Sequence, residues 1–243
     1  MRRSYGQYCG LARALEIVGE RWALLIAILG VVNILYGAAL AFVQKEFRLV
    51  LAYSSISHMG VVLIAIASLN AVGVQGAVFQ MVSHGLISAL MFLIVGSLYE
   101  RTSTTELPKL GGFAKPMPFI SGMLLLAGMA SLGLPGLSGF VSEYLSFLSL
   151  FGSMPVVTSI GCLGIIVTAV YVLRGVMSIT FGQASEPALS YKDARLIEAI
   201  PMIALTAFII LIGLYPAVLS EPLQSTIGGI ERWLAGADAI KGG

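Results

Sequence analysis

Charged side chains are scarce in this 243-residue sequence: they make up 11% of it, against about 25% in an ordinary globular domain. Hydrophobic residues make up 58%. One soluble core of this size cannot bury so much apolar surface, because the surface-to-volume ratio of a domain limits what it encloses. The composition therefore excludes a soluble domain and indicates a protein that lies in lipid. The net charge of +2 is also too small to indicate a nucleic-acid partner.

Cysteine is rarer still. The two cysteines, Cys9 and Cys162, lie far apart and form no metal-binding pattern. The sequence also lacks a glycine-rich nucleotide loop and a pattern of haem ligands, so we expect no cofactor and no metal in this chain. Its basic start, MRRSYGQYCGLARALE, has neither the apolar stretch nor the small-residue cleavage site of a signal peptide. We therefore expect that this segment is not a signal peptide.

Long apolar runs are what the sequence does contain. A helix needs about 20 mostly apolar residues to cross the hydrocarbon of a membrane. In lipid each backbone polar group must be paired within its own segment, so each run is predicted to be helical. The predicted fold class is an all-α membrane protein with about six transmembrane helices, near residues 23–43, 50–69, 77–99, 119–151, 156–181 and 197–215.

The loops between these runs differ in basic charge, which predicts their orientation. Apart from the N-terminal segment, one side receives only Arg232 and Lys241. The other side is therefore predicted to be cytoplasmic, and it receives Lys45, Arg48, Arg101, Lys109, Lys115, Lys192 and Arg195. The N-terminal segment conflicts with this orientation, because its arginines would lie on the outer side.

Few ionisable residues fall within the runs: His58, His84, Glu143 and Arg174, with Glu198 close to the edge of the last one. Such groups are costly in lipid and usually face a bundle interior or a water-filled path. A neutral histidine can donate at one ring nitrogen and accept at the other, which suits a proton relay. Alternatives stay open: each histidine alone also fits a plain interhelical hydrogen bond, Glu143 a helix cap, and Arg174 an anchor or a partner for a carboxylate.

The fourth run, which contains GMASLGLPGLSGFVSEYL, is predicted to break into two half-helices. Gly133, Pro135, Gly136 and Gly139 lie inside it, just ahead of Glu143. Proline removes a helical hydrogen-bond donor and glycine loosens the backbone. A broken helix at mid-membrane, flanked by charge, is a sequence sign of an ion path in a transporter. A plain proline kink made for packing is the alternative.

Four segments carry a resemblance to a known family: QKEFRLVLAYSSISHMGVVLIAI, GAVFQMVSHGLISALMFLIVGSLYERTSTTELPKLGGFAKPMP, MASLGLPGLSGFVSEYL and IGLYP. Over residues 27–216 they resemble the C-terminal half of the proton-pumping membrane subunits known as subunit M or chain 4 of NADH-quinone oxidoreductase, respiratory complex I. Related chains occur in Mrp-type sodium/proton antiporters and in membrane-bound hydrogenases.

This resemblance implies a bundle with two inverted repeats, of which the chain matches the second repeat and the closing helix. It implies that His58, His84 and Glu143 belong to a proton path. Arg48 stands where a lysine is more usual, which keeps the charge but not easy deprotonation. With Arg174, it is expected to be a supporting charge. The implied partners are the other membrane subunits of the oxidoreductase and the lipid bilayer of a bacterial inner membrane. The redox chemistry and the reduction of quinone would lie in partner chains.

The family's first half is absent from the sequence. Residues 1–26 are instead similar to the opening of an HxlR-type winged-helix regulator, including Cys9, and their pattern predicts an amphipathic helix. The similarity ends before any recognition helix, so DNA binding does not follow. We therefore expect a foreign segment at 1–26, a membrane domain at 27–220 and a polar tail at 221–243. The sequence leaves three functions open: a truncated complex I subunit, a subunit of an Mrp-type antiporter, and a non-functional membrane fragment.

Overall fold

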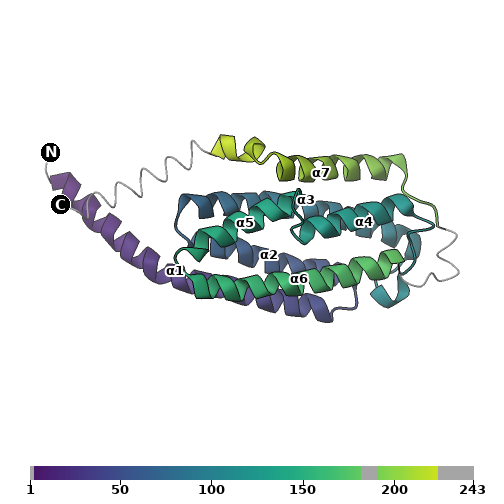
Figure 1. Cartoon of the computed structure of the whole chain (residues 1–243), viewed down its shortest axis with the longest axis horizontal. Coiled ribbons are helices and arrows are strands. Elements are labelled where there is room, and N and C mark those ends of the chain that lie inside the picture. The colour runs from purple at the N-terminus through teal and green to yellow at the C-terminus, as the bar shows by residue number, and fades with distance from the viewer. Residues whose placement is uncertain (1–2, 182–190, 224–243) are drawn as a thin grey trace.

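The structure is a computed structural model that describes residues 3–181 and 191–223. Within those ranges all regular structure is helical, apart from one isolated antiparallel bridge between Glu46 and Glu106. The predicted all-α class is confirmed. The elements are α1 (Arg3–Val43), α2 (Phe47–Ala67), α3 (Ala71–Thr102), a short 3-10 turn (Leu107–Lys109), α4 (Pro118–Ser131), α5 (Ser138–Phe151), α6 (Pro155–Phe181) and α7 (Leu196–Leu214), and they form one elongated bundle (Figure 1).

Five of these helices are long and apolar enough to cross a membrane: Trp22–Val43 of α1, and α2, α3, α6 and α7. Helices α4 and α5 have 14 residues each. At 1.5 Å per residue each is about 21 Å long, too short to cross about 30 Å of hydrocarbon alone. They follow one another in the chain, and together they occupy the fourth predicted run. The six predicted spans are therefore present, and the fourth one is broken.

Helix α1 is the longest element and contains 41 residues. Its length of about 60 Å is twice the thickness of the hydrocarbon, and its first part extends beyond the rest of the bundle (Figure 1). No helix end marks the junction that we expect between the foreign segment and the membrane domain. The side chains before Trp22 lie outside the described part of the chain, as does most of the predicted tail, so both domain boundaries remain predictions.

Small residues let α1 and α2 approach closely. A side chain at Gly60 would come within 2.7 Å of Ile34, and one at Gly37 would come within 2.7 Å of the Ser57 amide. The Ser57 hydroxyl donates to the carbonyl of Ile34 at 3.0 Å. Small residues and interhelical hydrogen bonds of this kind hold membrane helices together in the absence of a hydrophobic driving force. The contact fixes the depth of α2, which carries one of the two histidines.

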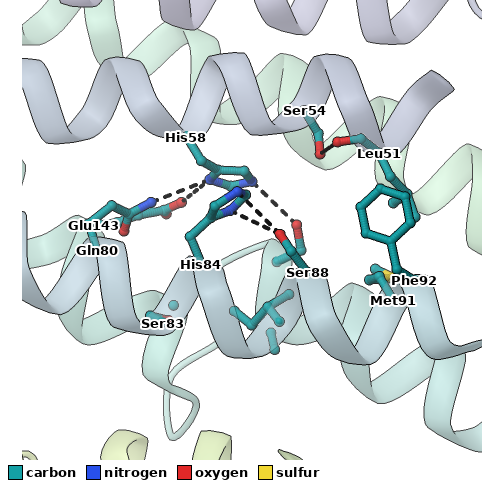
Figure 2. A pocket seen from close by; sticks show the side chains of 14 residues that line it. Leu51, Ser54, His58, Gln80, Ser83, His84, Ser88, Met91, Phe92 and Glu143 are labelled. Carbon is teal, nitrogen blue, oxygen red and sulfur yellow. Dashed lines mark hydrogen bonds and ion pairs between the residues drawn. The ribbon is translucent and has the colours of Figure 1, made fainter. Parts of the chain in front are cut away.

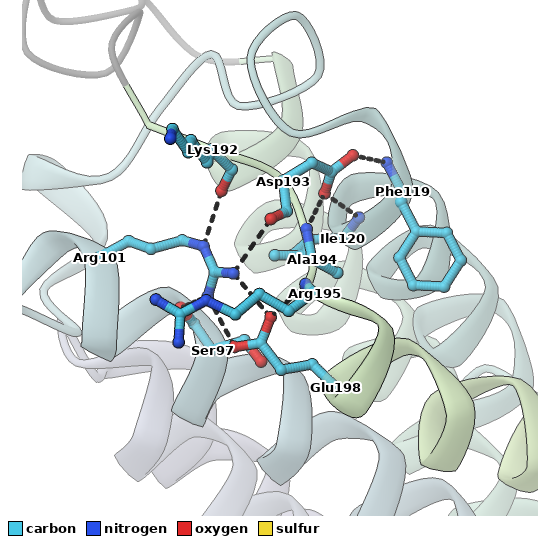
Figure 3. A network of polar contacts seen from close by, with 9 residues as sticks. All are labelled: Ser97, Arg101, Phe119, Ile120, Lys192, Asp193, Ala194, Arg195 and Glu198. Atoms are coloured by element: carbon cyan, nitrogen blue, oxygen red, sulfur yellow. Dashed lines mark hydrogen bonds and ion pairs between the residues drawn. The ribbon is translucent and has the colours of Figure 1, made fainter.

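A polar network joins the ends of α3, α4 and α7 on the predicted cytoplasmic side (Figure 3). The Arg101 guanidinium donates to both carboxylate oxygens of Glu198, at 2.7 and 3.1 Å, and to the backbone carbonyls of Ser97, Lys192 and Asp193. The Asp193 carboxylate accepts from two backbone amides in the first turn of α4, at 2.7 and 3.2 Å. Glu198, expected at the edge of the last span, is therefore a structural partner of Arg101.

Replacing Arg101 with methionine is expected to destabilise the bundle by about 3 kcal/mol, because the largely buried Glu198 carboxylate would lose its partner. The measurement is thermal unfolding of the chain in lipid nanodiscs. Lys109→Met is the matched control, since the Lys109–Glu106 pair is 61% and 47% exposed and should contribute less than about 1 kcal/mol. Equal stability of the two variants would contradict a structural role for the network.

Candidate functional site

The break between α4 and α5 results from glycine conformations that other residues rarely adopt. Gly133 has a φ of 68° and Gly136 a φ of 95°, and Pro135 lies between them. Gly139 lies three residues after Gly136, in the first turn of α5. A side chain there would overlap the carbonyl oxygen of Ala130 near the end of α4. The glycines thus let the start of α5 pass directly against the end of α4.

Helix α7 also depends on a glycine at the break. A side chain at Gly213 would overlap the carbonyl oxygen of Gly136 and would come within 2.5 Å of the Leu137 Cα atom. The far end of α7 therefore packs against the backbone of the broken segment. Gly213 was not among the predicted site residues, and a glycine within an apolar helix gives little sign of the surface that it faces.

The three predicted relay residues meet beside this break, and each comes from a different helix. His58 lies in the middle of α2, His84 in the middle of α3 and Glu143 in α5 (Figure 2). The ring centroids of the two histidines are 5.2 Å apart. The Nδ1 atom of His58 lies 3.8 Å from the Oε1 atom of Glu143. His58 and Glu143 are buried and His84 is partly buried, so the cluster lies inside the bundle.

Three further polar side chains contact the histidines and were not predicted. The Nε2 atom of Gln80 lies 3.4 Å from His58 Nδ1, and the Ser131 hydroxyl lies 3.4 Å from His58 Nε2. The Ser88 hydroxyl lies 3.2 Å from His84 Nε2. Spacing offered a clue for two of them, because Gln80 and Ser88 are each four residues from His84 and so share one face of α3. Ser131 lies at the end of α4, where the sequence alone could not place it.

The cluster lines a small cavity of about 20 Å³, which is room for about one water molecule. Besides the six polar groups, its lining includes Leu51, Ser54 and Met91. Leu51 and Ser54 lie on α2 between His58 and the predicted cytoplasmic end, so the cavity extends from the histidines towards that side (Figure 2). Groups that both donate and accept hydrogen bonds, joined by a water-sized space, can pass a proton along.

Serines bring α5 close to α3 and so bring Glu143 to the histidines. The Ser83 and Ser138 hydroxyls are 2.7 Å apart, and a side chain at Gly76 would come within 2.9 Å of the Ser146 amide. The Asn70 side chain, which caps the start of α3, donates to the Ser149 carbonyl at 3.0 Å. This interface accounts for the depth at which Glu143 lies.

The two predicted supporting charges lie away from the cluster. The exposed Arg48 places its guanidinium over the Tyr99 ring, 5.2 Å from the ring centroid. Arg174 lies over the Phe42 ring at 5.4 Å and donates to the Phe42 carbonyl near the end of α1, at 3.3 Å. These contacts match the anchor interpretation of Arg174. Neither arginine lines the cavity.

Comparisons with known proteins agree on one family. Residues 6–170 match the family model described as "NADH:quinone oxidoreductase/Mrp antiporter, TM". The chain is 40% identical to NADH-quinone oxidoreductase subunit M of Rickettsia felis over 88% of this chain and 43% of that protein. It is 39% identical to NAD(P)H-quinone oxidoreductase chain 4 of Prochlorococcus marinus over 95% of this chain and 45% of that protein.

Solved structures give the same result. A chain of respiratory complex I from Thermus thermophilus with bound NADH superposes with a TM-score of 0.82 at 29% identity, over 87% of this chain and 45% of that chain. A chain of the Mrp complex from a Dietzia species shares the fold, with a TM-score of 0.80 at 18% identity, over 91% of this chain and 49% of that chain.

Two limits on the match are plain. The chain spans less than half the length of the relatives named here. The range matched by the family model also begins at residue 6, inside the segment 1–26 that we expected to be foreign. The match still covers most of the chain and confirms the resemblance seen in the sequence. The chain is an integral membrane protein that belongs to the NADH:quinone oxidoreductase/Mrp antiporter transmembrane family.

Proposed function

We propose that this chain forms part of a proton path in the membrane arm of a proton-translocating NADH-quinone oxidoreductase. The observation that carries the proposal is the convergence of His58, His84 and Glu143 from three helices on one internal cavity beside a helix break. Intramembrane ionisable groups in such a position are typical of proton relays. The redox chemistry is assigned to partner chains, and no cofactor is assigned to this one.

The proposed route starts at the cytoplasmic side of the cavity, passes the two histidine rings and reaches Glu143. The distance of 3.8 Å from His58 Nδ1 to the Glu143 carboxylate is too long for a hydrogen bond. A side-chain movement of about 1 Å, or a bridging water, would make the contact. In this arrangement a proton therefore cannot pass directly from His58 to Glu143. A change in neighbouring charge could bring the two side chains within hydrogen-bonding distance.

Partner chains are part of the proposal. The solved neighbours belong to multi-subunit complexes. We propose the other membrane subunits of such a complex as partners, and a bacterial inner membrane as the location. A subunit of an Mrp-type sodium/proton antiporter is the second candidate, favoured by the fold that the chain shares with the Mrp complex.

The first test is isolation of the chain in its native assembly. The tagged chain is produced at native level, the membranes are solubilised gently, and the co-purifying proteins are identified by mass spectrometry. Subunits of an NADH-quinone oxidoreductase are expected. Recovery with antiporter subunits, together with sodium-dependent transport, would favour the second candidate. A chain that is recovered alone or degraded would be a non-functional fragment.

In the isolated complex, His58→Ala is expected to lower NADH-driven proton translocation by about 100-fold, the lower end of the effect of a positioned proton-transfer group. The measurement is acidification of vesicles that contain the complex. Ser55→Ala is the matched control on the same helix, because among the described residues the Ser55 hydroxyl bonds only to the carbonyl of Leu51 in its own helix. Undiminished translocation in the His58 variant would refute the relay.

A further inference from the structure

The Nδ1 atom of His58 faces two groups that make opposite demands. The Gln80 amide nitrogen, 3.4 Å away, can only donate a hydrogen bond to it. The Glu143 carboxylate, 3.8 Å away, can accept a proton from it. A ring nitrogen without a hydrogen accepts and a protonated one donates, so Nδ1 cannot satisfy both neighbours at once. The tautomer of His58 therefore determines whether Nδ1 accepts a hydrogen bond from Gln80 or donates one to Glu143.

Gln80 has a second arrangement available. Its side chain is 3% exposed, and its Oε1 atom is buried without a hydrogen-bond partner among the described residues. An unpaired buried carbonyl oxygen is costly. Rotation of the amide by half a turn would exchange the two atoms and would direct the oxygen at Nδ1, where it could accept from an N–H. The same side chain can thus support either tautomer of His58.

The other ring nitrogen does not discriminate between the tautomers. His58 Nε2 lies 3.4 Å from the Ser131 hydroxyl, which can either donate or accept. His84 approaches His58 ring to ring, and its own hydroxyl partner is Ser88. Among the groups described around His58, only Gln80 and Glu143 favour one tautomer over the other.

We propose that Gln80 is a positioning residue that selects the tautomer of His58. When a proton binds Nε2, the ring carries two protons, and the Nδ1–H bond then breaks as its proton passes to Glu143. The ring is left with hydrogen on Nε2 alone. With its N–H directed at Nδ1, Gln80 stabilises this Nε2–H form and delays the return of the ring to the Nδ1–H form. Rotation of the amide favours the Nδ1–H tautomer again. The ring regains that tautomer when water in the cavity takes the proton from Nε2 and supplies one to Nδ1, which readies the ring for the next proton.

The consequence for transport rests on the proposed function, but the tautomer itself can be observed without it. The chain contains only two histidines, so labelling histidine with ¹⁵N in the full chain, isolated with its native partners and a histidine-free tag, gives signals from two rings in this chain. The shifts of the ring nitrogens distinguish the tautomers, and a His84→Gln sample assigns the His58 signals. The Nε2–H form is expected to predominate in the parent chain.

Gln80→Met removes the donor at similar volume, and Gln80→Glu replaces it with an acceptor. Both substitutions are expected to shift His58 towards the Nδ1–H form by about fivefold to tenfold, the equivalent of one hydrogen bond. Gln75→Met is the matched control, because it makes the same change on the same helix outside the cavity lining. If Gln80→Met does not accumulate, Gln80→Asn, whose amide is too short to reach the ring, is measured in its place.

An unchanged His58 tautomer in these variants would overturn the proposal and would make Gln80 a packing residue only. A shifted tautomer in a complex whose parent chain does not pump protons would support the role of Gln80 and refute the proposed function. An unchanged tautomer together with normal pumping in the parent would refute the role of Gln80 and support the proposed function. The two failures are therefore distinguishable.

Discussion

Replacing Glu143 with glutamine is expected to stop NADH-driven proton translocation in the isolated complex. Glutamine keeps the size of the side chain and can still form hydrogen bonds, but it cannot bind and release a proton. Glu143 also lies at the break, where its Oε2 atom approaches within 2.7 Å of the position that a side chain at Gly133 would occupy. No other carboxylate lines the cavity, so no alternative acceptor is at hand among the described residues.

The measurement compares vesicle acidification with electron transfer from NADH to quinone in the same preparation. Translocation is expected to fall by about 100-fold or more, whereas assembly of the complex should be unaffected. Glu106→Gln is the matched control, since Glu106 lies on the surface and, in the part of the chain that the structure describes, forms an ion pair only with the exposed Lys109. A Glu143→Gln complex that acidifies vesicles at the parent rate would remove Glu143 from the path.

Replacing Gly139 with alanine is expected to destabilise the bundle by about 3 kcal/mol. The new methyl group would overlap the Ala130 carbonyl and would lie 3.6 Å from the Cα atom of Gly133. Both neighbours are backbone atoms, which cannot rotate away as a side chain can. The start of α5 would therefore have to separate from the end of α4, and Glu143 would move with it.

Thermal unfolding in nanodiscs measures this loss, and the level of the chain in membranes provides a second reading. Gly122→Ala is the matched control, because it lies in α4 with no heavy atom within 4 Å of the new methyl group. That change should alter stability by about 1 kcal/mol or less. If both variants melt alike, the close contact across the break does not hold the two half-helices together.

The fold could be predicted from local patterns to an unusual extent. Apolar runs indicated the spans, because membrane thickness fixes their length. Gly133, Pro135 and Gly136 indicated the break, because their backbone preferences do not depend on neighbours far along the chain. The two histidines and Glu143 were identified because ionisable groups are rare and costly in lipid. Each of these features could be predicted because its physical cause lies within a single segment of the chain.

What could not be predicted depends on contacts between segments. Ser131 matters because its hydroxyl contacts the His58 ring, and no feature of its own segment indicates that contact. The role of Asp193 likewise depends on a distant segment, since its carboxylate accepts hydrogen bonds from the first turn of α4, which begins 75 residues earlier in the chain. The contacts of Arg48 and Arg174 with aromatic rings also join separate segments, and the sequence did not indicate them.

The length of helix α7 sets the depth at which the break lies, because contacts hold the helix near both of its ends. Its first turn is fixed by the pair between Arg101 and Glu198, and Gly213 near its last turn fits against Leu137. Glu198 and Gly213 are 15 positions apart, which corresponds to about 23 Å along the helix at 1.5 Å per residue. Deleting one residue between them would shorten the helix by about 1.5 Å and turn Gly213 by about 100°. A bulky side chain would then face the backbone at Leu137, so the register of α7 and the position of the broken segment are set together.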